Sequence, residues 1–163
     1  MLARSKTKAT QAELESYYRE LQPFSVAPLW TEGARAGLAT EPKSKAVPHL
    51  WRWRDLRPRA LHAGELIGTQ DAERRVLRLL NPGIPERTAT TNSLFAGLQI
   101  VMPGEIARAH HHTPAALRFI IESEGGYTNV NGEPIPMLPG DLVLTPNWTW
   151  HDHANNTNSP MIW

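Results

Sequence analysis

Two stretches of sequence decide the fold of this chain: GEIARAHHH (residues 104–112) and GDLVLTPNWTWHDHAN (residues 140–155). Side chains of a β-strand alternate between its two faces, so a strand through the first stretch turns His110 and His112 to one face and His111 to the other. A neighbouring strand through the second stretch would add His151 to the face of that pair. Three imidazole nitrogens on one face can bind a metal ion and leave its opposite positions open for reacting ligands. Together the two stretches predict a metal centre between two strands.

The consecutive histidines also have a simpler explanation, a solvated polar tract, because an isolated His-x-His pair often matches by chance. The second stretch favours metal binding: a Pro-Gly-Asp turn, an apolar strand, a proline and then His151 follow in the order that carries a third imidazole to the first pair. His49 and His62 lie in segments without such a pattern, and we interpret them as surface or packing residues. Trp148 and Trp150 alternate with His151, and we interpret them as core or interface residues on the opposite face.

From Ser93 onward the chain consists of short strand-like segments separated by turn residues. The segments read LFAGLQIVM, ALRFIIES, GYTNV, EPIPM, DLVLT, WTWHDH and PMIW. Asn131-Gly132 is a two-residue hairpin signal, and Leu-Pro-Gly-Asp at residues 138–141 is a second turn. This pattern predicts an all-β core, an antiparallel sandwich or barrel of the jelly-roll type.

The amino-terminal part has a different texture. Thr10 followed by Glu13 is a capping-box pattern that predicts a helix through Leu21. Prolines and tryptophans are then scattered over residues 23–59 without a clean periodicity, so we expect an extended arm whose tryptophans dock on another surface.

Residues 64–80, GELIGTQDAERRVLRLL, predict a short helix that carries Arg74 and ends at the Asn-Pro-Gly that follows. We therefore divide the chain into a helical and extended arm, residues 1–63, and a barrel, residues 64–163. The final PMIW reads as the start or middle of a strand, so we expect the barrel to be truncated before its last strands. Such an unpaired edge would make this part aggregate or pair abnormally when produced alone.

Composition limits the classes of function. With 163 residues, 40% of them hydrophobic and 20% charged, the chain has the composition of one globular domain. A formal charge of +1 and a pI near 8.2 provide no basic stripe for nucleic acid. The absence of cysteine excludes disulfides, thiolate metal sites and cysteine nucleophiles. The first residues contain no apolar run long enough for a signal peptide or a membrane span, so we expect a cytoplasmic protein that does not bind membranes.

The two stretches match the two cupin motifs, and residues 107–156 resemble the amino-terminal cupin of the gentisate 1,2-dioxygenase family, which includes salicylate and 1-hydroxy-2-naphthoate ring-cleaving enzymes. ALRF (residues 116–119) and WHDH (residues 150–153) carry this resemblance, because the generic cupin pattern requires neither. The resemblance covers residues 65–163 well and the arm more loosely. Trp148 stands where the generic motif has glycine, and the family resemblance tolerates a bulky residue there.

The resemblance implies Fe(II) bound by His110, His112 and His151, and a homotetramer of chains in which a second cupin follows this one. The glutamate of generic cupin sites is absent, since Ala116 and Leu117 occupy its expected positions. Three neutral imidazoles leave the metal its full double charge. That charge suits an anionic bidentate ligand such as an ortho-hydroxybenzoate.

Four further residues are candidates for the substrate side. Arg118 lies an even number of residues beyond the first histidine pair, so alternation places its guanidinium on the ligand face, where it could hold a carboxylate or a reduced oxygen species. His153 shares the face of His151, and the resemblance implies that it is the acid or base that takes the phenolic proton. The resemblance also implies that Gln99 and Arg74 face the aromatic ring and its substituents.

The resemblance and the open three-histidine face together predict an Fe(II)-dependent dioxygenase whose partners are a small aromatic acid and O2. It would convert gentisate to maleylpyruvate, with salicylate and 1-hydroxy-2-naphthoate as alternative substrates. Two other classes stay open. One is a non-catalytic cupin that binds an aromatic acid, and the other is a cupin isomerase or decarboxylase that uses Mn or Zn.

Overall fold

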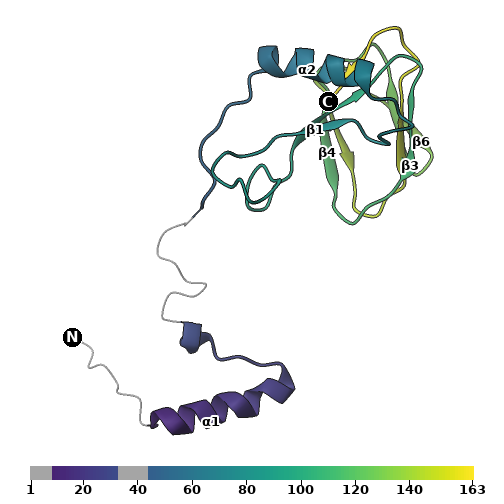
Figure 1. The fold of residues 1–163 in the computed structure, drawn as a ribbon. Coiled ribbons are helices and arrows are strands. Elements are labelled where there is room, and N and C mark those ends of the chain that lie inside the picture. The colour runs from purple at the N-terminus through teal and green to yellow at the C-terminus, as the bar shows by residue number, and fades with distance from the viewer. Residues whose placement is uncertain (1–8, 33–43) are drawn as a thin grey trace. The chain divides into compact units, whose positions relative to one another are not determined.

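The computed structural model of the chain describes residues 9–32 and 44–163. The chain separates into two compact units, Met1–Lys43 and Ser44–Trp163 (Figure 1). No helix in the described ranges is both long and apolar enough to cross a membrane.

The first unit contains the predicted amino-terminal helix. Helix α1 (Gln11–Leu21) begins with a capping box: the Glu13 backbone N–H donates to Thr10 Oγ1 at 3.3 Å, and the Thr10 backbone N–H donates to the Glu13 carboxylate at 2.7 Å. Two short 3-10 helices follow, η1 (Gln22–Phe24) and η2 (Leu29–Glu32). The capping-box prediction is therefore confirmed.

The second unit is an antiparallel β structure with one helix, α2 (Trp53–Leu66). Its strands are β1 (Val76–Arg78), β2 (Gly97–Val101), β3 (Ile106–His110), β4 (Ala116–Phe119), β5 (Tyr127–Val130), β6 (Glu133–Pro136), β7 (Leu142–Thr145), β8 (His151–Ala154) and β9 (Met161–Ile162). They form three sheets in the orders β1-β2-β9, β3-β8-β5-β6 and β4-β7. The Ile121 N–H donates to the Ile162 carbonyl at 2.9 Å, which connects the end of β4 to β9. The predicted all-β jelly-roll barrel is confirmed.

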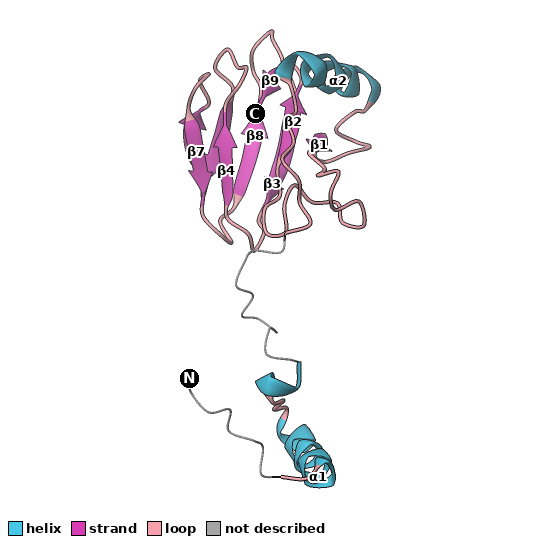
Figure 2. Ribbon diagram, turned by 90° about the vertical axis from the view of Figure 1, so that its left-hand side faces the viewer, coloured by secondary structure: helices cyan, strands magenta, loops and turns pink. Residues whose placement is uncertain are grey.

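Alternation along the strands gives the barrel an inner and an outer apolar layer. Val101 and Met161 belong to the buried cluster between the sheets. Their neighbours Ile100 and Ile162 face outward and pack against Ala60 of α2. Figure 2 shows α2 on the β1 and β2 side of the barrel, with β4 and β7 away from the helix.

The extended arm expected over residues 23–59 is wrong from Trp53 onward, where α2 begins; no helical periodicity is visible there, and Pro58 lies inside the helix. The apolar side of the helix, which includes Trp53 and Ala60, packs on the sheet and offsets that interruption. Trp53 therefore does dock, as expected of the arm, but from a helix. Trp30 stays exposed and donates from Nε1 to the Tyr18 hydroxyl at 3.1 Å.

The helix predicted over residues 64–80 is wrong. Helix α2 ends at Leu66, a loop follows, and β1 pairs with β2. The reason is tertiary: the buried Arg75 guanidinium donates to the Ile67 carbonyl at 2.7 Å and forms an ion pair with Glu105, which anchors this loop to the start of β3. The predicted division into residues 1–63 and 64–163 stays a prediction, although α2 runs across that position.

Candidate metal centre

Three histidines meet where β3 ends and β8 begins. His110, the last residue of β3, pairs with His151, the first residue of β8. His112 follows just beyond the end of β3. One nitrogen of each ring lies within 4.8 Å of the other two. The structure thus brings the predicted metal ligands together, and no carboxylate joins this group among the residues that it describes.

A β-bulge in β3 turns His110 into the barrel. Ala107 pairs with His153 and His110 pairs with His151, so β3 has one more residue than β8 over the same distance. Strict alternation would place Ala107 and His110 on opposite faces. The extra residue reverses the alternation, as bulges do beside active sites, and both side chains then face inward.

Backbone carbonyls orient two of the rings and place a hydrogen on Nδ1 of each. His151 Nδ1–H donates to the Thr149 carbonyl at 2.8 Å, and His112 Nδ1–H donates to the Pro114 carbonyl at 2.7 Å. Each ring therefore offers the lone pair of Nε2. The Nε2 atom of His151 is buried and has no hydrogen-bond partner in the structure. Such orientation by a second hydrogen bond is typical of histidines that bind metals.

Arg74 reaches the third ring. It lies in the loop before β1 and not on a helix, and its Nε–H donates to His110 Nε2 at 3.1 Å, while its Nη2 donates to the Arg108 carbonyl at 3.0 Å. Burial and then the charge of Arg74 lower the pKa of His110 to about 4. Burial also lowers the pKa of His151. Both imidazoles are therefore neutral near pH 7, as metal ligands must be.

Arg118 lies inside the barrel on β4, with 6% of its surface exposed. It donates to the Thr145 hydroxyl. Burial, followed by the charge of Arg74, lowers the pKa of Arg118 to about 10. Within the described residues no acidic group forms an ion pair with it. Thr145 was not predicted as a site residue. It lies two residues after Val143 on β7, so it shares the buried face of that strand, and its hydroxyl could have been placed inside the barrel.

Two further polar side chains on the inner face have unsatisfied atoms. Both ring nitrogens of His153 are buried without a hydrogen-bond partner, and burial, then the charge of Arg118, lowers its pKa to about 2. The Nε2 atom of Gln99, on β2, is likewise buried and unpartnered. Buried polar atoms without partners are rare in proteins and indicate a place where a ligand supplies the missing contacts.

The two tryptophans of the second stretch lie on the face opposite His151, as predicted, but they are exposed surface residues and not core. Both contact the His111 ring, with ring centroids 4.2 Å away for Trp148 and 4.3 Å away for Trp150.

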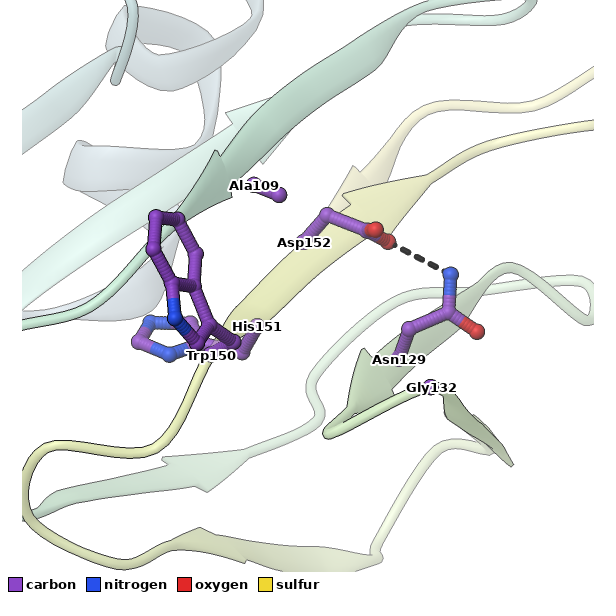
Figure 3. Close-up of a pocket in the computed structure, with 6 residues that line it drawn as sticks. All are labelled: Ala109, Asn129, Gly132, Trp150, His151 and Asp152. Atoms are coloured by element: carbon purple, nitrogen blue, oxygen red, sulfur yellow. Dashed lines mark hydrogen bonds between the residues drawn. The ribbon is translucent and has the colours of Figure 1, made fainter.

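A hollow of about 210 Å³ also opens here, lined by Trp150, His151 and Asp152 among others (Figure 3). Asp152 lines it and accepts a hydrogen bond from Asn129 Nδ2 at 2.7 Å. Because Asp152 alternates with His151 and His153, this hollow is not the interior site.

Comparisons with known proteins agree with this geometry. The cupin domain family matches residues 97–163. Gentisate 1,2 dioxygenase 1 of Aquipseudomonas alcaligenes is 44% identical over 155 residues, which are 95% of this chain and 44% of that protein. A 5-aminosalicylate 1,2-dioxygenase of Comamonas sp is 38% identical over 94% of this chain and 41% of its own length. The solved salicylate 1,2-dioxygenase of Pseudoaminobacter salicylatoxidans, in a structure of its adducts with gentisate, superimposes with a TM-score of 0.75 at 42% identity, over 98% of this chain and 43% of the other.

The inward-facing histidines on a jelly-roll barrel, together with the domain match, define a cupin. The chain spans less than half the length of the relatives that it matches. Within the cupins it belongs to the gentisate 1,2-dioxygenase family.

Proposed function

We propose that this chain forms the metal-binding cupin of an Fe(II)-dependent dioxygenase that cleaves the ring of an ortho-hydroxy aromatic carboxylate, with gentisate as the main substrate. The observation that carries the proposal is the charge of the barrel interior. Arg118 is buried beside neutral imidazoles with no acidic partner in the part of the chain that the structure describes, and Arg74 adds a second guanidinium. Buried charge is stable when it is paired, so the interior requires an anion.

The residues fit an iron ion. His110, His112 and His151 would hold it through neutral nitrogens, and the absence of a carboxylate from their group leaves the ion its full charge for an anionic substrate. When bound, Fe(II) supplies the redox chemistry that allows an aromatic ring to react with O2. At His110, the Arg74 contact occupies the Nε2 lone pair, so we expect Arg74 to release this atom when the metal binds.

The other inward residues bind and orient the substrate. Arg118, held by Thr145, would donate charge-assisted hydrogen bonds to the substrate carboxylate or to reduced oxygen. Both ring nitrogens of His153 lack a partner, and the one with the lone pair would accept the phenolic proton once the anionic substrate offsets the burial and the nearby positive charge that lower the pKa of this ring. Gln99 and Arg74 would contact the ring and its substituents. Because these groups come from separate strands and one loop, the barrel holds them around one interior site.

Salicylate and 1-hydroxy-2-naphthoate are the alternative substrates, because relatives in the comparisons are named for salicylate, aminosalicylate and hydroxynaphthoate cleavage. We further propose a homotetramer located in the cytoplasm.

The test is an anaerobic Fe(II) load of the native protein, followed by addition of O2 and each of the three acids. Oxygen uptake and a new ultraviolet band from the ring-opened product, with gentisate giving the highest rate, would support the proposal. The His112→Ala variant provides the background rate. Uptake equal to that background with all three acids would exclude dioxygenase activity and leave a binding cupin.

A further inference from the structure

One of the proposed ligands lies outside the regular strand pairing. The ladder between β3 and β8 ends at the pair His110 and His151, and His112 follows two residues later. A backbone hydrogen bond reaches it from the opposite loop, since the Trp148 N–H donates to the His112 carbonyl at 2.8 Å. The position of His112 therefore depends on the conformation of Trp148.

That conformation is unusual. Trp148 has a φ of 59°, in the left-handed region that favours glycine and is rare for bulky side chains. Glycine is also the residue of the generic cupin motif at this place. Burial does not explain a tryptophan here, because its side chain is 61% exposed. A strained residue that is neither glycine nor buried is expected to have a role that compensates for the strain.

The contacts of the indole suggest that role. The His111 ring lies against both indoles, 4.2 Å from Trp148 at an interplanar angle of 86° and 4.3 Å from Trp150 at 54°. We call these three residues the aromatic clamp. His111 sits between two proposed ligands in sequence, and Trp150 directly precedes the third, as Figure 3 shows for Trp150 and His151. The clamp thus joins the two ligand-bearing segments on the outer face, directly behind the metal centre.

We propose that Trp148 is a positioning residue for the metal centre: its left-handed backbone holds the His112 carbonyl, and its indole, with Trp150, holds His111, so that His112 keeps its place beyond the end of β3. This inference rests on the proposed metal centre. In this role Trp148 contacts neither metal nor substrate and acts only through His111 and His112.

The experiment is a Co(II) titration of the metal-free native protein, followed through the visible absorption of the bound ion, which responds to ligand geometry. Trp148→Gly keeps the backbone N–H and suits the left-handed φ, so it removes the indole alone. We expect its Kd for Co(II) to rise about tenfold, as for loss of a residue that orients a ligand, and its visible spectrum to change. His111→Ala should have the same effect to a smaller extent. Trp148→Phe should restore the wild-type Kd.

Trp30→Gly is the matched control, since Trp30 is 62% exposed and belongs to the other compact unit. It should bind Co(II) like the wild type, and the thermal midpoint of each metal-free variant reports its folding. A wild-type Kd and spectrum for Trp148→Gly would overturn the proposal, as would an equal loss in Trp30→Gly. If Trp148→Gly does not fold, the His111→Ala variant provides the test. A wild-type Kd for Co(II) in that variant would show that the aromatic clamp does not position the metal centre. A wild-type protein that binds no Co(II) would instead refute the metal centre itself.

Discussion

Replacement of Arg118 by methionine should make the metal-free protein more stable and the enzyme much less active. The pKa of the buried guanidinium falls from its usual 12.5 to about 10, chiefly through burial. Each pH unit corresponds to about 1.4 kcal/mol, so the charged form destabilises the fold by about 3 kcal/mol. This destabilisation is fully present below the folded-state pKa, and therefore at pH 7, and it fades between about 10 and 12.5 as the folded state loses the proton. Methionine fills a similar volume without charge. Loss of the hydrogen bond to Thr145 lowers the free energy of unfolding by about 1 kcal/mol, which offsets part of the gain.

The expected net gain is therefore about 1 to 2 kcal/mol in the free energy of unfolding, measured by urea denaturation of the metal-free protein at pH 7. The kcat/KM for gentisate should fall by the equivalent of about 2 to 5 kcal/mol, because a charge-assisted contact at a desolvated site is lost. Iron content should not change. A variant that is less stable than the wild type, or that keeps its kcat/KM, would show that Arg118 is a structural residue and not the anchor of an anionic substrate.

Three further changes test other parts of the molecule. His151→Ala removes one of the three proposed ligands and should abolish both iron retention, measured by metal analysis, and turnover. His153→Ala should lower kcat more than it lowers iron content, because the ring is proposed to accept a proton and not to bind iron; an equal loss of both would contradict that role. The double variant Leu117→Lys with Leu144→Glu replaces an exposed cross-strand apolar pair, 65% and 60% exposed, by opposite charges. Light scattering should show less self-association with unchanged iron content, and an unchanged scattering signal would show that this face does not drive association.

The sequence was sufficient to predict the barrel and the grouping of the histidines. Both predictions use the alternation of side chains along a strand, which can be seen in a short stretch of sequence. Arg118 also faces the interior, but the assumption behind its placement was wrong, because the chain leaves β3 at His110 and re-enters a strand of another sheet at Ala116. The rule does not extend across the bulge between Ala107 and His110, where the register shift is visible only in the pairing with β8. It gave the correct face for the histidines because they lie on one side of the bulge.

The errors in the amino-terminal half have a different origin. Pro58 argued against a helix that packing on the sheet stabilises. Residues 64–80 contain a helix-like pattern, but the buried Arg75 is held by backbone carbonyls and by Glu105, partners that cannot be inferred from local sequence. The role of Trp148 also required the structure, since neither its φ nor its contact with His111 follows from residue spacing.

The bulge in β3 makes the register of two strands, in addition to side-chain chemistry, a determinant of how many imidazoles face the interior. If the present residues paired with β8 without the bulge, Ala109 would take the place opposite His151, and His111 would turn inward while its two neighbours turned to solvent. The same three imidazoles would then offer the interior one nitrogen from β3 instead of two. A shift of one residue in this pairing would therefore keep every proposed ligand in the sequence and still destroy the geometry of the three-histidine face.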